Sequence, residues 1–162
     1  MATTYDKIAT TTLGSATTVT FSSIPQTYTD LRIVEWLIGD YGNPYFWINN
    51  DTSALYSNTF LQGNGSVVNS GYNASTNQIN SGQASTSTYG FPIFTTTDIF
   101  SYTGSTYKSC LSTQSFDRNG GGSTSRTVSL YRSTAAITRL DINIGAGGSY
   151  SGYVTLYGIK AA

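Results

Sequence analysis

One carboxylate stands out in this chain of 162 residues as a candidate for acid–base chemistry. Glu35 is the only glutamate, and it lies in the middle of the apolar run 31–38. Strand alternation would put its side chain on the same face as leucine and isoleucine side chains, where burial raises the pKa of a carboxyl group. Glu35 could then act as a general acid, with Asp30 or Asp40 as the second carboxylate of a glycosidase pair.

A structural role for Glu35 is the alternative that the composition favours. The chain has no histidine and a single cysteine, Cys110, so most of the side chains used in acid–base and nucleophilic catalysis are missing. We therefore expect Glu35 to pair across the sheet with an arginine such as Arg132 or Arg139. We expect Cys110 to be a small buried hydrophobic residue. The sequence predicts a protein that is not an enzyme and has no cofactor.

Oxygen-bearing side chains gather around two predicted turns and could hold a calcium ion. They are Asp40, Asn43, Asn49, Asn50 and Asp51. Their spacing matches no EF-hand loop, and asparagine and aspartate are common in turns because they tolerate left-handed backbone geometry. The usual zinc and iron ligand sets are also missing, since the chain has no histidine and one cysteine. We predict ordinary turns and no metal.

The charge of the chain is low and balanced. Eight basic residues match eight acidic ones, and charged residues make up only 10% of the chain, compared with about 25% in an average domain. No basic stripe exists that could neutralise phosphates, so nucleic acid is not an expected partner. No apolar run is long enough to cross a membrane, and the N-terminus lacks the features of a signal peptide. We expect a soluble protein, made in a cytosol, whose weakly charged surface suits a homo-oligomer.

The hydrophobic pattern predicts an all-β fold. Period-two runs separated by turn residues dominate, and no segment has a convincing helical stripe. We expect one domain over 1–162, an antiparallel β-sandwich that resembles a jelly roll. Segment 1–13 is a possible N-terminal strand or arm, and 58–90 is expected to form long polar loops with one or two short edge strands. The other predicted strands are 17–22, 31–38, 45–48, 93–102, 107–116, 126–132, 138–144 and 153–160.

Three details of this prediction concern how the strands are placed. The first two strands are expected to form a hairpin, because a short Gly-Ser turn separates them. The run 31–38 is apolar on both faces, as expected for a central strand that is covered on each side. In the last strands alternation predicts a core side and a solvent side. The core side would hold Val128, Leu130, Leu140, Ile142 and Ile144, and the solvent side Ser129, Tyr131, Arg139, Asp141 and Asn143.

Aromatic residues are abundant, with 13 tyrosines, seven phenylalanines and two tryptophans. Tyrosine is enriched at protein contacts and also stacks on sugars, and several tyrosines fall in or beside predicted loops, where a core role is not automatic. We select eight residues as candidates for an interface, two of them from the N-terminal segment. These are Tyr5, Ile8, Tyr41, Tyr45, Tyr56, Tyr72, Tyr89 and Tyr150.

The two ends of the chain carry a recognisable pattern. It consists of ATTYDKIATTTLGS at 2–15, FSSIP at 21–25, YTDLR at 28–32, YRSTAAIT at 131–138 and TLYGIK at 155–160. This pattern resembles a family of small virion-associated proteins from tailed phages that infect aquatic bacteria. The middle of the chain, 40–90, departs from it. The resemblance carries over no catalytic or binding residue.

The resemblance implies a structural protein of the virion, made in the host cytoplasm. The expected role is a capsid decoration or cement protein that binds the major capsid protein or other virion subunits. Such proteins commonly form small oligomers, trimers among them. The N-terminal segment 2–12 could add a strand to the sheet edge of a neighbour. The alternative is a tail or fibre adhesin that binds host-surface glycan through loops 58–90.

Overall fold

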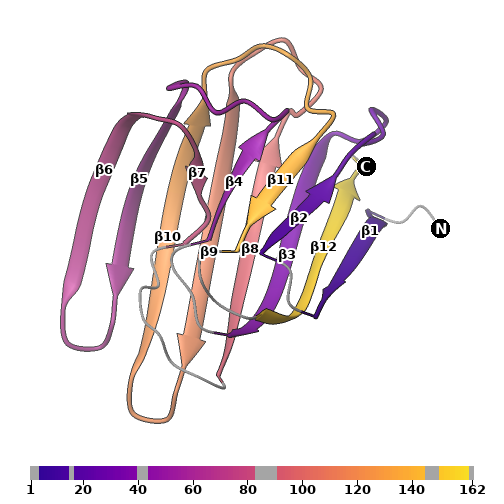
Figure 1. The fold of residues 1–162 in the computed structure, drawn as a ribbon. Coiled ribbons are helices and arrows are strands. Elements are labelled where there is room, and N and C mark those ends of the chain that lie inside the picture. Colours follow the sequence, from indigo (N-terminus) through magenta and orange to yellow (C-terminus); the bar gives the residue numbers. More distant parts are fainter. Residues whose placement is uncertain (1–3, 15–16, 40–43, 83–90, 145–149, 161–162) are drawn as a thin grey trace.

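The structure is a computed structural model that describes residues 4–14, 17–39, 44–82, 91–144 and 150–160. These residues contain twelve β-strands in two antiparallel sheets and no helix (Figure 1). The larger sheet holds, in spatial order, β1 (Tyr5–Leu13), β12 (Tyr150–Ile159), β3 (Asp30–Gly39), β8 (Pro92–Phe100), β9 (Lys108–Asp117), β10 (Gly122–Tyr131), β5 (Tyr56–Gly63) and β6 (Val68–Thr76). The smaller sheet holds β2 (Thr18–Phe21), β11 (Leu140–Asn143), β4 (Tyr45–Ile48) and β7 (Ile79–Asn80).

The connections confirm the predicted sandwich and give it jelly-roll topology. Four strands of the larger sheet, in the order β1-β12-β3-β8, face the four strands of the smaller sheet, in the order β2-β11-β4-β7. Along the chain these eight strands wrap around the barrel-like sandwich as in a jelly roll. Two additional hairpins, β9–β10 and β5–β6, extend the larger sheet sideways (Figure 1). β5 still contacts β7 of the smaller sheet through Asn58, and β6 forms the outer edge.

The predicted hairpin between the first two strands was wrong. β1 pairs with β12 in the larger sheet, and β2 pairs with β11 in the smaller one. The chain therefore passes from one sheet to the other after Leu13, and a turn signal alone does not show whether the next strand will pair or cross over. Segment 1–13 was expected to be either a strand or an arm, and its described residues form the strand β1 at the edge of the larger sheet. Deleting 2–12 would remove this edge strand from the fold.

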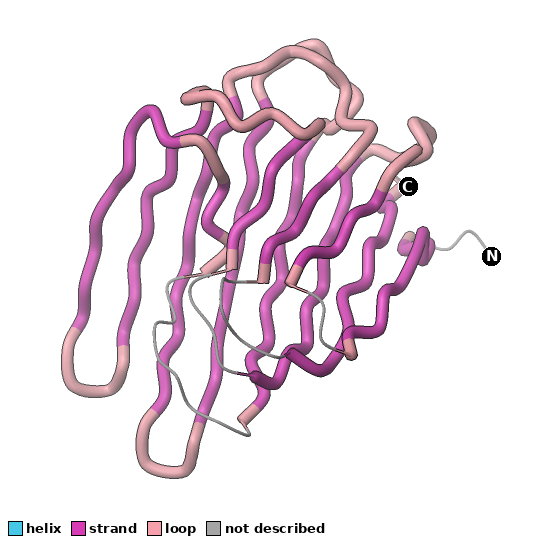
Figure 2. Tube along the Cα trace, in the orientation of Figure 1, coloured by secondary structure: helices cyan, strands magenta, loops and turns pink. Residues whose placement is uncertain are grey.

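The hydrophobic core fills the space between the two sheets. From the larger sheet it takes side chains of β3 and β12, among them Leu31, Ile33 and Leu156, which are at most 1% exposed. From the smaller sheet it takes Phe46, Ile142 and others that are fully buried. Figure 2 shows the strands of the smaller sheet lying over the strands of the larger sheet in this region. Burial of these branched and aromatic side chains is the main stabilising term for the sandwich.

The predicted core side holds for β11, and the predicted faces are inverted for β10. Asp141, expected on the solvent side of β11, is only 4% exposed and binds Thr20 and Arg139. Leu140 and Ile142 of β11 are fully buried, as expected. On β10, Ser129 and Tyr131 point into the sandwich, whereas Val128 is 52% exposed on the other side. The polar groups can enter because they find partners there, as when the Ser129 hydroxyl donates to Asn58 Oδ1 at 2.7 Å.

Segment 58–90 contains more regular structure than predicted. A hairpin formed by β5 and β6 occupies most of its first half, and the short β7 follows. The turn between them is Asn64-Gly65-Ser66-Val67, with Gly65 at φ 86°, and the Asn64 N–H donates to the Val67 carbonyl at 3.2 Å. Glycine at the first central position is typical of the tight turns that close hairpins. The expected edge strand is present as β6. The expected long loops are not found between 58 and 82, and residues 83–90 lie outside the described residues.

Candidate interaction surface

The most unusual surface of the molecule is the side of the larger sheet that faces away from the smaller sheet, which we call the outer face. All twelve strands belong to the two sheets, so no element in the described part of the chain covers it. An antiparallel sheet with one face in solvent normally turns its polar side chains outward. Here β5, β9 and β10 place aliphatic side chains outward among serines and threonines. Leu61 and Val128 are 55% and 52% exposed, and Leu111 is half-buried beside them.

Polar side chains take the inner positions of the same strands. Thr97 and Ser112 share a hydrogen bond of 2.8 Å, and Gln114 Nε2 donates to the Thr95 hydroxyl at 3.4 Å. At the next register position, Asn58 accepts from the backbone of Asn80 at 3.1 Å. The inner side of β5, β9 and β10 is therefore mixed, with Tyr56, Cys110 and Tyr131 beside these polar groups. The polar groups are stabilised by hydrogen bonds to β8 and to β7 of the smaller sheet.

Three aromatic side chains form a row on the outer face across β12, β3 and β8. Tyr153, Trp36 and Phe94 occupy directly opposite positions in the strand register. The Trp36 and Tyr153 rings are stacked with centroids 5.8 Å apart and planes at 16°, and Phe94 is 47% exposed. Since the two stacked rings turn a face towards each other, they do not present both faces to a ligand. Such a row is well suited to packing against another protein.

Two shallow depressions lie on the outer face next to β5 and β10. One has a volume of about 320 Å³ and is lined by Leu61, Leu111, Val128 and Arg126 with their neighbours on β5. The other has a volume of about 390 Å³, adjoins the first at Leu61 and Arg126, and reaches Val68 on β6. The first depression is lined mainly by apolar side chains, the second has Leu61 and Val68 among polar residues, and Arg126 is the charged residue of both. Shallow hollows that open widely to solvent fit the side chains of a protein partner better than a small ligand.

One charged network lies at the β1 side of the outer face. Arg32 binds Asp98 through two hydrogen bonds, of 2.6 Å from Nε and 2.8 Å from Nη2, and donates from Nη1 to the Tyr5 hydroxyl at 2.9 Å. The Asp98 carboxylate raises the pKa of Arg32. The charges of Arg32 and Asp98 neutralise each other, and the exposed Lys7, in the same register row as Arg32, adds a positive charge to this part of the outer face.

The eight candidate interface residues divide into three groups. Tyr5 and Tyr72 are exposed, at 47% and 77%, and Tyr45 and Ile8 are half-buried, with Ile8 packed against the core. Tyr56 is fully buried, so its prediction as an interface residue was wrong. The other three candidates stay predictions. Tyr41 and Tyr89 lie outside the described residues, and Tyr150 begins β12 with a side chain that is not described.

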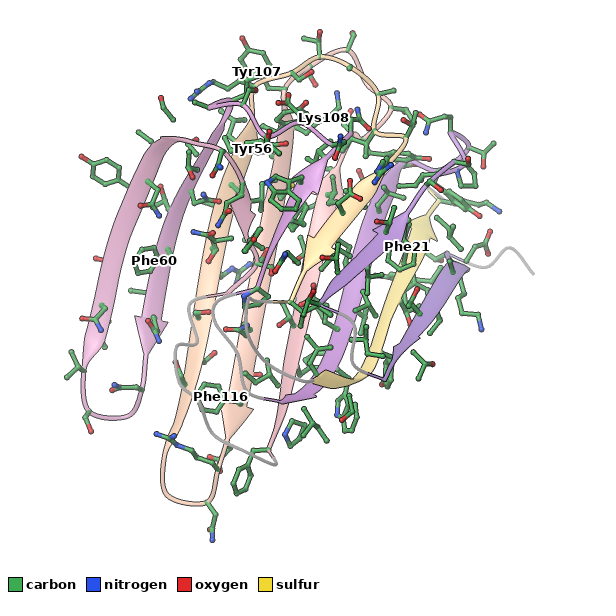
Figure 3. All side chains as sticks on the ribbon, in the orientation of Figure 1. Phe21, Tyr56, Phe60, Tyr107, Lys108 and Phe116 are labelled. Carbon is green, nitrogen blue, oxygen red and sulfur yellow. The ribbon has the colours of Figure 1, made fainter. Side chains whose placement is uncertain are left out.

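Tyr56 is buried because the turn before it is short and brings β5 back over the core. Its ring stacks on Tyr131 with centroids 4.7 Å apart, and its hydroxyl donates to the Asp51 carbonyl at 2.7 Å. Burial raises the pKa of Tyr56. Figure 3 shows Tyr56 near the same end of the sandwich as Lys108, a fully buried lysine whose ammonium group donates to the carbonyls of Gly104 and Thr106.

The sequence did not point to the residues that make the outer face apolar. Trp36, Phe94, Leu61, Leu111 and Val128 all lie in strands, where aliphatic and aromatic residues are expected to face the core. The available signal was the run 31–38, which is apolar on both sides and was expected to be covered on both. The structure covers only the inner side with described residues.

Glu35 lies in the core, as alternation predicted, but without the predicted arginine. Its side chain is 1% exposed, and neither carboxyl oxygen makes a hydrogen bond within the described residues. Burial raises the pKa of Glu35 to about 7, an effect that the neighbouring Thr95 hydroxyl partly offsets. Arg139 instead binds Asp141 at 2.7 Å, and Arg132 donates to the Ala54 carbonyl.

The glycosidase pair is not formed by Glu35 and Asp30. The two residues have opposite parity on β3, so Asp30 points away from the core, and it accepts a hydrogen bond from the Ser101 backbone at 2.7 Å. Asp40 lies outside the described residues. Glu35 is therefore a buried acid that no described carboxylate accompanies on its face.

The candidate calcium ligands that can be seen act as turn residues. Asn49 and Asn50 have positive φ angles of 54° and 58°. The Asn49 side chain accepts from the backbone of Thr138 at 2.9 Å and donates to the Ala136 carbonyl at 2.9 Å. Asp51 accepts from Ser53 and from the Tyr131 hydroxyl. Among the described residues no group of three or more potential metal ligands of the His, Cys, Asp and Glu types is found.

Cys110 is fully buried, which confirms its prediction as a buried hydrophobic residue. Burial raises the pKa of its thiol to about 12.

No helix in the described residues is long and apolar enough to span a membrane. No protein-family model, curated protein or solved structure matches the chain.

Proposed function

We propose that the protein is a structural protein of a phage virion, a decoration protein that binds the assembled capsid and stabilises it. The observation that carries the proposal is the outer face. A sheet surface that exposes aliphatic and aromatic side chains, such as Leu61, Val128 and Phe94, among its polar ones suits contact with another protein. The resemblance of the two chain ends to small virion-associated proteins indicates which kind of assembly that is.

The physical basis of such stabilisation is mass action. A protein that binds the assembled shell and does not bind free capsid subunits shifts the equilibrium towards the shell. Apolar contacts supply the binding free energy at roughly 25 cal/mol per Å² removed from water, and a surface with few charges avoids the desolvation penalty of buried ions. The outer face offers exposed apolar side chains for such contacts, and the charges of Arg32 and Asp98 on it neutralise each other, whereas Arg126 would need an acidic or polar partner on the shell.

The proposal is tested with capsids from which the protein has been removed. Val128→Lys places a charge at the centre of the outer face, and Thr134→Lys places the same charge in an exposed loop as a matched control. We expect the Val128 variant to bind the capsids at least about tenfold more weakly, since truncating or charging a central contact typically costs more than 1 kcal/mol. The control should bind like the parent protein. Equal binding by both variants and the parent would contradict the proposal.

Glycan binding by 58–90, as a tail or fibre adhesin, is the second candidate. One observation favours it, which is the 77% exposure of Tyr72 on the hairpin that this segment forms. A lone aromatic ring can stack on a sugar, but its neighbours on the same face, Val68 and Ser70, offer few groups for hydrogen bonds to hydroxyls. If this candidate is right, Tyr72→Ala reduces binding to host cells while capsid occupancy by the protein is zero.

A further inference from the structure

The two sheets have four edge strands, and only one of them is unprotected in the described part of the chain. β2 and β7 have four and two residues. β1 carries Asp6 and Lys7, and a bulge interrupts its register after Lys7. β6, in contrast, has nine residues, VNSGYNAST, with no charge and no proline, and its irregularity lies only at its end, between Asn73 and Thr76. Natural proteins normally blunt a long edge strand with charge, proline, a bulge or short length, because its open backbone groups pair readily with another strand.

The hairpin turn fixes which backbone groups of β6 are open. The Asn64–Val67 pair is hydrogen-bonded across the turn, and antiparallel pairs alternate between hydrogen-bonded and non-hydrogen-bonded ones. The next pair, Gly63 with Val68, is therefore non-hydrogen-bonded towards β5, as are the pairs that involve Ser70 and Tyr72. The N–H and C=O groups of Val68, Ser70 and Tyr72 thus point away from β5, along the open edge. The ladder continues in register up to Asn73, before the irregularity towards Thr76.

We propose that this edge pairs with the same edge of a second copy of the chain, antiparallel and with the two-fold axis at Ser70. In this register Ser70 lies opposite Ser70 of the second copy, and Val68 lies opposite Tyr72. All three positions then form hydrogen-bonded pairs, because each brings its open N–H and C=O groups to the interface. The contact is isologous, so it closes with two copies.

The side chains support a second copy as the occupant. Val68 and Tyr72 are the two most exposed large hydrophobic residues, at 72% and 77%, and the two-fold places each of them beside the other type. An aromatic residue opposite a β-branched one is among the favourable cross-strand pairs. A charged strand would meet its own charge across a two-fold axis, and β6 carries none. Both side chains lie on the outer face, so pairing would extend one apolar surface over two copies.

A biological role for this dimer rests on the proposed function as a subunit of an assembly, but the pairing itself can be tested with the purified protein. The first experiment is Ser70→Cys, with Ser66→Cys in the adjoining turn as the matched control. Residues in a hydrogen-bonded antiparallel pair have Cα atoms about 5.5 Å apart, within the range that a disulfide spans. Cys110 is fully buried and does not compete. We expect the Ser70 variant to form a covalent dimer under mild oxidation, at least about tenfold faster than the Ser66 variant. Equal rates would overturn the proposed register.

The second experiment uses charge. Val68→Lys with Tyr72→Lys sets like charges against each other at both cross-strand positions, and Val68→Lys with Tyr72→Glu sets opposite charges there. Sedimentation should give the monomer mass for the first double variant and twice that mass for the second. All three substitutions are on exposed positions, and unchanged thermal unfolding checks that the fold is kept. The same mass for both double variants would overturn the proposal. A dimer in solution together with absence from virions would sink the proposed function and leave this inference standing.

Discussion

The buried Glu35 makes the stability of the protein depend on pH in a defined window. Its side chain is 1% exposed and faces the core from the centre of β3, with Thr95 and Val154 as directly opposite neighbours. Burial raises its pKa from 4.5 to about 7. We predict that Glu35→Gln leaves stability unchanged below pH 4.5 and increases it progressively as the pH rises towards 7.

The sign and size of the effect follow from proton binding. Below pH 4.5 the carboxyl group is protonated in both the folded and the unfolded chain, so its ionisation does not lower the free energy of unfolding there. Between pH 4.5 and about 7 the unfolded chain releases the proton while the folded chain keeps it, so the free energy of unfolding falls as pH rises. Each pKa unit corresponds to about 1.4 kcal/mol, so the total loss is about 3 kcal/mol above pH 7.

Urea unfolding of the parent and the Glu35→Gln variant across this pH range measures the effect. The difference between the two proteins removes the contributions of other titrating groups, such as Asp51 and Asp141, whose pKa values are lowered in the fold. Asp117→Asn, which removes an exposed carboxylate, is the control and should follow the parent. A free-energy difference between parent and Glu35→Gln that does not change with pH would refute the reasoning, because it would mean that Glu35 titrates alike in both states.

Three further predictions concern other parts of the sandwich. Gly158→Ala should lower the free energy of unfolding by about 1–3 kcal/mol, since a Cβ there would lie 2.3 Å from the base of the Tyr28 ring; an unchanged denaturation midpoint would speak against this contact. The Cys110 thiol should react with an aromatic disulfide reagent only after unfolding, and rapid labelling of the native protein would contradict its burial. Asn49→Ala should lower stability by about 1–3 kcal/mol through lost turn hydrogen bonds, whereas Asn49→Gly, which keeps the positive φ, should lower it less in the same urea titration.

Local pattern was sufficient to find most strands but not to pair them. The strand predicted at 45–48 matches β4, and 31–38 lies within β3, because alternation and flanking turns are local signals. The partners of β1 and β2 are more than a hundred residues away in sequence, in β12 and β11, and no local signal contains that information. The hairpin of β5 and β6 was missed for a related reason, since β6 is exposed on both sides and lacks hydrophobic alternation.

The candidate surface was only partly predictable, because the opposite sheet decides which side of each strand faces the core. For β10, Val128 and Leu130 were assigned to the core by hydrophobicity, but Tyr131 on the other parity stacks on Tyr56, and the strand turns that side inward. Tyr5 and Tyr72 are exposed, so their role as interface residues stays a prediction. Tyr56 is buried, because the chain returns into the core directly after the turn that precedes it.

Imaging purified virions tests the central claim, that this is a decoration protein of a phage capsid, most directly. A reconstruction of the intact virion would show how many copies are present, where they lie, and which side of the larger sheet each one turns towards the shell. The proposed function predicts many copies over the capsid, with Val128 and Phe94 of the outer face against capsid subunits. Copies confined to the tail or fibres, or an outer face turned to solvent throughout, would contradict it.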